Sequence, residues 1–128
     1  MPEDDPVVKI SIPGDPRFLR VARLTASALA ADAGLTVEQV EDVRVAIDEL
    51  CAALVLDAPD LAPPIELSFR VDGERLVVTG ERAGAGTLSE LDPIARELLA
   101  VTADEHELGV DGDRRWFRLV KGSEAATL

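Results

Sequence analysis

The chain has 128 residues, 47% of them hydrophobic, which predicts one domain over residues 1–128 with a single core and tails at 1–6 and 122–128. Its formal net charge of −12 argues against direct binding to nucleic acid or membrane surfaces, because both are anionic. One cysteine, no apolar run long enough to span a bilayer and an acidic N-terminus predict a cytoplasmic protein without disulfides.

The first two predicted elements are a strand and a helix. Alternating apolar residues over 7–12 predict an edge or half-buried strand. Asp15-Pro16 predicts the N-cap and first position of a helix over 17–33, and Gly34 suits the position just after its end. Its buried face is predicted to comprise Phe18, Val21, Leu24, Thr25, Ala28 and Leu29.

A second amphipathic helix is predicted over 36–56. Thr36 and Gln39 have the spacing of a capping box at its start. Glu49 and Ala53 are four residues apart, so they point the same way from neighbouring turns. The apolar stripe of this helix comprises Val37, Val40, Val43, Ile47, Leu50, Cys51 and Leu54.

Four more strands and a third helix complete the predicted fold. The strands lie at 65–71, 76–79, 107–110 and 114–120, and the helix begins at Asp92-Pro93. The inward residues of that helix are predicted to be Ile94, Leu98 and Val101. The order of elements predicts an α+β two-layer sandwich, a mostly antiparallel or mixed sheet with helices on one face.

Residues 45–55, Val-Ala-Ile-Asp-Glu-Leu-Cys-Ala-Ala-Leu-Val, resemble the first conserved box of the GHKL ATP-binding superfamily, in particular the RsbW-like anti-sigma-factor serine kinases. The resemblance implies that Glu49 takes the place of the family's general base. Ala53 stands where the family has the asparagine that holds magnesium-bound ATP, and its methyl group offers no oxygen to a hard cation. The element order fits a GHKL domain from about residue 7 to 121.

The second family box, Asp-x-Gly-x-Gly, is matched by Arg82-Ala83-Gly84-Ala85-Gly86. Arg82 replaces the aspartate that accepts a hydrogen bond from adenine, and arginine is only a donor. Gly84 and Gly86 fit an ordinary flexible connection equally well. Between Gly86 and Ile94 there is no glycine, and two acids occupy the place of the family's phosphate loop. A degenerate pocket without conventional ATP or magnesium binding is expected.

Arg17, Arg20 and Arg23 recur every three residues on the first helix and form a candidate basic ridge. A solvated helix face explains the same spacing. However, Phe18-Leu19-Arg20-Val21 resembles the Phe-x-Arg-Val pattern of the anti-sigma family, which implies that Arg20 meets a sigma factor.

Three other residues have simple alternative interpretations. Glu49, next to Asp48, fits a solvated position on the polar side of its helix. Cys51 lies on the apolar stripe and is predicted to be a core residue rather than a redox switch. His106 has no further nitrogen or sulfur ligands at suitable spacing, so no metal site is predicted.

The resemblance implies a regulatory protein that binds and sequesters a sigma factor and is displaced by a STAS-type antagonist. The altered boxes favour a pseudo-kinase that lacks conventional ATP binding. The alternative is an active ATP-dependent serine kinase that phosphorylates this antagonist, with Glu49 as the base. A scaffold that binds another partner through the old pocket is a third class. The resemblance also implies homodimers.

Overall fold

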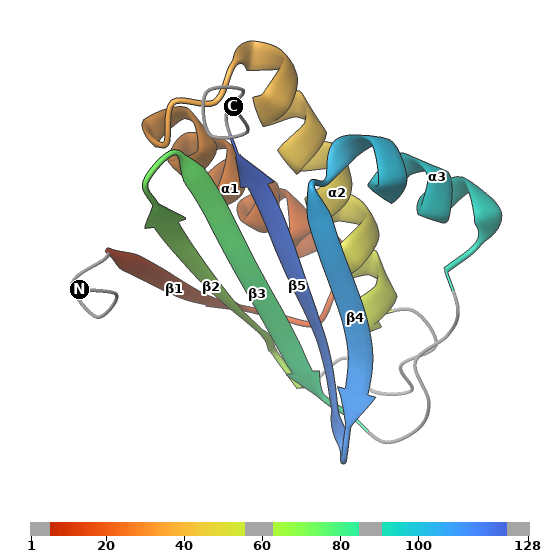
Figure 1. Ribbon diagram of the computed structural model, residues 1–128. Coiled ribbons are helices and arrows are strands. Elements are labelled where there is room, and N and C mark those ends of the chain that lie inside the picture. The colour runs from red at the N-terminus through yellow and green to blue at the C-terminus, as the bar shows by residue number, and fades with distance from the viewer. Residues whose placement is uncertain (1–5, 56–62, 85–90, 123–128) are drawn as a thin grey trace.

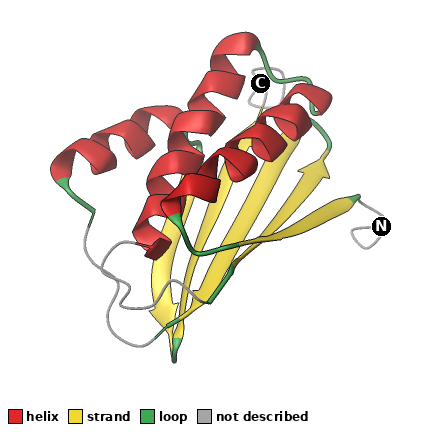
Figure 2. Cartoon of the chain, turned by 180° about the vertical axis from the view of Figure 1, so that it is seen from behind, coloured by secondary structure: helices red, strands yellow, loops and turns green. Residues whose placement is uncertain are grey.

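In the computed structural model, which describes residues 6–55, 63–84 and 91–122, five strands form one antiparallel sheet. The helices cover one face of it and leave the other open (Figure 1, Figure 2). The strand order is β1-β2-β3-β5-β4, which confirms the predicted fold class. The elements are β1 (Val7–Ile12), η2 (Pro16–Phe18, a 3-10 turn), α1 (Leu19–Asp32), α2 (Val37–Val55), β2 (Ile65–Asp72), β3 (Arg75–Ala83), α3 (Pro93–Thr102), β4 (Glu105–Asp111) and β5 (Arg114–Gly122).

The predicted helix starts are confirmed by hydrogen bonds. At α2, the Gln39 N–H donates to Thr36 Oγ1 at 3.2 Å, and the Thr36 N–H donates to Gln39 Oε1 at 2.9 Å. At α3, Asp92 accepts from the Ala95 N–H at 2.8 Å. Asp15 instead caps the turn η2, so the helix expected from residue 17 begins as a 3-10 turn and becomes α-helical at Leu19.

The buried face of α1 differs from the predicted one. The helix packs against α2 and the strands β2 and β3, and its fully buried residues are Ala22, Ala26 and Ala30. Small residues at four-residue spacing let two helix backbones approach closely, and large side chains at these positions would hold them apart. Of the predicted face, Leu29 packs against the core, and Phe18, Val21 and Leu24 are exposed instead.

The prediction for α3 is wrong in the same way. Its buried residues are Ala95, Leu99 and Thr102, each one position from the predicted set. Ile94 and Val101 are 71% and 75% exposed. Both stripes are largely apolar, so the pattern alone does not decide which one faces α2.

The longest helix, α2, buries the predicted stripe from Val43 onward, whereas Val40 is partly buried and Val37, at the helix start, is 84% exposed. Val43, Ile47, Leu50 and Leu54 are fully buried, and so is Cys51, which confirms its place in the core. Burial raises the pKa of the Cys51 thiol to about 12, so it stays protonated at neutral pH. Neither α2 nor another helix within the described ranges is long and apolar enough to cross a bilayer.

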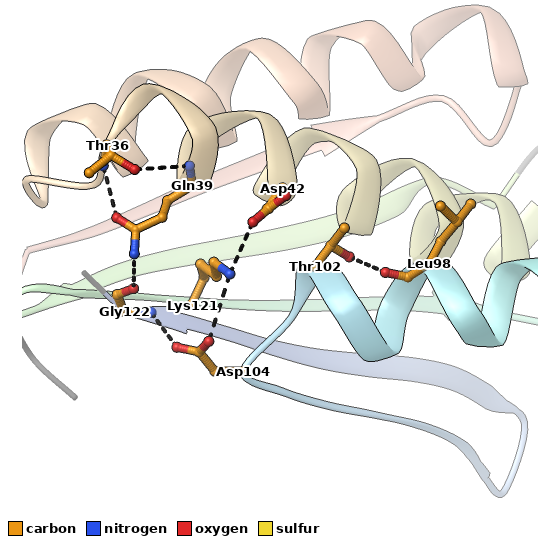
Figure 3. Close-up of polar contacts among 8 residues, drawn as sticks. All are labelled: Thr36, Gln39, Asp42, Leu98, Thr102, Asp104, Lys121 and Gly122. Carbon is orange, nitrogen blue, oxygen red and sulfur yellow. Dashed lines mark hydrogen bonds and ion pairs between the residues drawn. The ribbon is translucent and has the colours of Figure 1, made fainter. Parts of the chain in front are cut away.

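A nearly buried lysine, Lys121 on β5, joins three elements (Figure 3). Its Nζ lies 3.3 Å from Asp42 Oδ2 on α2 and 3.7 Å from Asp104 Oδ1, just before β4. Asp104 also accepts from the Gly122 N–H at 2.8 Å, and the Gln39 side chain donates to the Gly122 carbonyl at 3.2 Å. Gly122 was expected in the tail, but it belongs to β5; residues 123–128 lie outside the described part.

Replacing the charged group of this lysine tests its role. We expect Lys121→Met to lower the free energy of unfolding by about 1–3 kcal/mol, because two partly buried carboxylates lose their common partner. Urea denaturation measures the change. Lys9→Met, at an exposed position on β1, is the matched control and should stay within about 0.5 kcal/mol. Equal effects of the two substitutions would contradict this role.

Candidate functional site

Glu49 lies half-buried on α2, where the negative charge of Asp92 at the start of α3 acts on it. Partial burial raises the pKa of its carboxyl above the ordinary value, and the charges of Asp92 and Asp48 raise it further. The carboxyl therefore keeps its proton to higher pH than an exposed glutamate does. One turn later on the same helix, Ala53 is almost completely buried.

Arg82 is the largest fully buried side chain within the described part of the chain and is only 1% exposed. Its Nε donates to the Pro63 carbonyl at 2.9 Å, and its Nη1 donates to the Leu54 carbonyl at 3.2 Å. Leu54 is in the last turn of α2, where carbonyls lack partners within the helix and positive charge is favourable. Arg82 thus caps the C-terminal end of α2 and ties it to the start of β2.

Gly14 makes room for this guanidinium. A Cβ at position 14 would lie 2.3 Å from Nη2 of Arg82 and 2.6 Å from the Pro63 carbonyl oxygen. No side chain fits at such distances, so the glycine is required here by space. No local signal in the sequence reveals that residues 14, 63 and 82 meet, because they are far apart along the chain.

Of the two glycines predicted to line the pocket, Gly84 lies within the described residues and Gly86 does not. The Gly84 N–H donates to the Asp113 carbonyl at 2.7 Å, which extends the pairing of β3 with β5 by one residue. A Cβ at Gly84 would meet nothing within 4 Å. Gly86 lies outside the described residues, as does the rest of the segment 85–90.

The side chains at positions 53 and 82 do not match the groups that the family resemblance implies for holding a magnesium-bound nucleotide. Magnesium requires oxygen ligands, and Ala53 provides none. The guanidinium of Arg82 donates to two backbone carbonyls and cannot accept from an adenine amino group. In the described ranges, no group of three or more His, Cys, Asp or Glu side chains is placed to hold a metal ion.

The three arginines predicted to form a basic ridge have separate environments. Arg17 pairs with Asp15 at 2.8 Å, and Arg23 pairs with Asp48 on α2 at 3.1 Å. Arg20 is exposed and makes no hydrogen bond or ion pair with any residue that the structure describes. Arg20 is therefore the arginine of the three that is available to a partner.

Arg20 lies among exposed apolar side chains on the outer side of α1. Phe18, Val21 and Leu24 are 36%, 37% and 66% exposed. We call these four residues, Phe18, Arg20, Val21 and Leu24, the α1 ridge. Phe18, Val21 and Leu24 were predicted to be buried, although the alanines at 22, 26 and 30 indicate which side of the helix packs closely.

Comparison with known proteins supports the resemblance. The chain is homologous to the serine-protein kinase RsbW of Halalkalibacterium halodurans, with 31% identity over 71 residues, 56% of this chain and 44% of the relative. It is 30% identical over 73 residues to the RsbW of Bacillus subtilis, 56% of this chain and 46% of the relative. The chain thus spans less than half the length of these relatives. No protein-family model matches it.

A solved structure of the RsbU and RsbW domains of Rv1364c from Mycobacterium tuberculosis has the same fold. The match has a TM-score of 0.68 and covers 92% of this chain and 33% of that chain. The sequence identity is 14%, so this likeness concerns the fold alone. The predicted α+β fold of the RsbW type is confirmed.

The contact between Gly14 and Arg82 generates a stability prediction. Gly14→Ala should lower the free energy of unfolding by about 2 kcal/mol or more, because the new methyl group displaces Arg82 from two buried carbonyls. Gly84→Ala is the matched control and should change stability by less than about 0.5 kcal/mol, since its Cβ enters open space. Thermal and urea unfolding measure both. A neutral Gly14→Ala would show that Arg82 does not need this space.

The raised pKa of Glu49 predicts a pH dependence. The folded chain holds this proton more tightly than the unfolded chain, so stability falls as pH rises from the unfolded pKa through the folded pKa. Glu49→Gln should therefore be more stable than the parent chain at pH 7 and lose this advantage in acid. NMR titration of the Glu49 carboxyl should give a pKa that moves down in Asp92→Asn. A Glu49 pKa at or below the ordinary value would contradict the prediction.

Proposed function

We propose that this chain binds a sigma factor through the α1 ridge and keeps it away from RNA polymerase, without conventional ATP binding or kinase activity. The protein acts as a regulatory binding partner that occludes a surface. A STAS-type antagonist releases the sigma factor by competing for this chain.

The observation that carries the proposal is the α1 ridge itself. Large apolar side chains on a well-formed helix are turned to solvent, although the same helix buries alanines. Exposed apolar residues grouped around an arginine are typical of protein interfaces, where arginine and aromatic residues contribute much of the binding energy. Arg20 has no competing partner among the described residues, so binding does not first require an ion pair to break.

The charge distribution favours an oriented complex. The chain carries a net charge of −12, so a partner with a basic surface is attracted to most of the molecule. Arg20 provides a local positive group that can bind a carboxylate with two parallel hydrogen bonds. A partner with one acidic group within a basic surface therefore docks in one orientation.

The proposal that the chain lacks kinase activity rests on the side chains at positions 53 and 82. Ala53 offers no ligand to magnesium, and Arg82 is committed to the end of α2. Without phosphorylation, the antagonist is not inactivated by this chain. Release and recapture of the sigma factor then depend on the relative amounts and affinities of the two partners.

An active serine kinase is the second candidate function. It is favoured by the homology to the serine-protein kinases RsbW and by the presence of Glu49 at the position of the family's base. Calorimetric titration with ATP and magnesium distinguishes the two candidates. Saturable binding in the micromolar range that is lost in Glu49→Ala supports the kinase, whereas no binding supports the pseudo-kinase.

Charge reversal at Arg20 tests the interface. The sigma factors of the source organism, each purified, are titrated against the chain to find the one that binds. For that pair, Arg20→Glu should weaken the affinity by about 30-fold or more, the effect of losing an interface residue worth about 2 kcal/mol.

Two further variants complete the test. Arg44→Glu, at an exposed position on α2, is the matched control for charge and should change the affinity less than about threefold. Leu24→Asp should weaken binding as Arg20→Glu does, since it alters the apolar part of the ridge. Unchanged binding by Arg20→Glu and Leu24→Asp, with the fold intact by circular dichroism, would remove the ridge from the interface.

A further inference from the structure

The face of the sheet turned to the viewer in Figure 1 carries two adjoining depressions. They have volumes of about 420 Å³ and about 230 Å³, and both are lined by Ser68, Thr79 and Arg118. Helices cover the other face of the sheet (Figure 2). We call the combined surface the open-face groove, and its defining residues are Lys9, Ser68, Arg70, Thr79, Trp116 and Arg118.

The strand register places these residues in order. Lys9 on β1 is opposite Ser68 on β2, Ser68 is opposite Thr79 on β3, and Thr79 is opposite Arg118 on β5. Directly opposed residues share a face, so these four form one row across four strands. Strands are about 4.8 Å apart, so the row is roughly 14 Å long between its two cations. Arg70 lies two residues from Ser68, on the same face.

Two of the three cations of the groove have no partner among the described residues. Lys9 and Arg70 make no hydrogen bond or ion pair with any described residue, and the buried Nε of Arg70 has no acceptor. Arg118 has an ion pair with Glu107, but at 4.0 Å. A buried donor without an acceptor is unfavourable, and a bound anionic group would satisfy it.

Two acids, Glu66 and Glu81, also line the larger depression. Glu66 accepts a hydrogen bond from the neutral Ser11 hydroxyl at 3.1 Å and keeps its negative charge. Glu81 forms an ion pair with Arg114 at 3.2 Å. The charged lining of the two depressions is thus three cations and two acids, one acid being paired with an arginine, on a chain whose net charge is −12.

Trp116 provides an apolar surface beside these charges. It is half-buried and lies against Gly109 on β4, where an added Cβ would be 3.1 Å from the indole ring. Tryptophan and arginine are the residue types that contribute most often to binding energy at protein interfaces.

We propose that the open-face groove binds an extended acidic segment of a partner protein. A depression on one side of a sheet is shallow, whereas small-molecule sites bury most of their ligand, so a chain segment suits it better. Consecutive residues of an extended chain advance about 3.3 Å, so carboxylates four positions apart lie about 13 Å apart. This spacing matches the row from Lys9 to Arg118. An apolar side chain two positions from each carboxylate lies on the same side of the segment as they do. It therefore enters the larger depression, which Trp116 lines beside Arg118.

The single tryptophan of the chain makes the binding measurable. The probe is the blocked peptide Glu-Ser-Val-Ser-Glu, whose two glutamates and valine share one face when it is extended. It is titrated into the full chain at low ionic strength while Trp116 fluorescence is recorded. We expect a saturable change that weakens as salt is added. Lys-Ser-Val-Ser-Lys, the control peptide, should give none. No saturable change with the acidic peptide, or equal binding of both peptides, would overturn the proposal.

Variants locate the site. The double substitution Arg70→Gln and Arg118→Gln should weaken peptide binding at least tenfold, and Lys9→Gln, at a fully accessible position, should weaken it severalfold. Arg75→Gln, on β3 outside the groove, is the matched control and should bind like the parent chain. Arg20→Glu should also leave peptide binding unchanged, which separates this site from the α1 ridge. Equal effects of Arg75→Gln and the groove variants would contradict the assignment.

A second copy of the chain is the competing occupant. Sedimentation velocity over a range of concentrations reports self-association of the parent chain and of the groove variants. A dimer that the double substitution dissociates would assign this face to self-association and overturn the proposal. A sedimentation coefficient that is the same for all variants supports it.

Discussion

The packing of α1 through its buried alanines, Ala22, Ala26 and Ala30, determines what the molecule presents to other proteins. Small residues on this side let α1 approach its neighbours closely, and Leu19 and Leu29 are the large α1 residues that pack against the core. Phe18, Val21 and Leu24 lie outside this contact and are exposed near Arg20. The surface proposed to bind a sigma factor is therefore the outer side of a tightly packed helix, which holds it rigidly in place.

Two buried cations fix α2 at its opposite ends. Lys121 pairs with Asp42 in the N-terminal half of the helix, and Arg82 caps the carbonyl of Leu54 in its last turn. Since α2 contacts both other helices and the sheet, these cations orient the whole helical layer. Although the chain has a large excess of acids, two of its few cations, Lys121 and Arg82, are buried and stabilise the fold.

Local signals made much of the fold predictable. The capping box of Thr36 and Gln39 and the apolar stripe of α2 depend on residues within a few turns. The structure contains the capping box as expected, and the stripe from Val43 onward. The predicted buried faces of α1 and α3 were wrong because each helix has two apolar stripes. Which stripe faces the core depends on which one has the small residues that close packing needs. The role of Arg82 could not be predicted from the sequence, because its partners, Leu54 and Pro63, lie far from it along the chain.

The fit of Arg82 against Gly14 also limits how this corner of the protein can change. With arginine at position 82, a Cβ at position 14 meets both the guanidinium and the Pro63 carbonyl. A single substitution at position 14 therefore disturbs the cap of α2, although residue 14 makes no hydrogen bond with the helix itself. Loss of the arginine in turn removes the donor from the carbonyls of Pro63 and Leu54. Positions 14 and 82 are consequently constrained together, and a change at one limits which residues the other can carry.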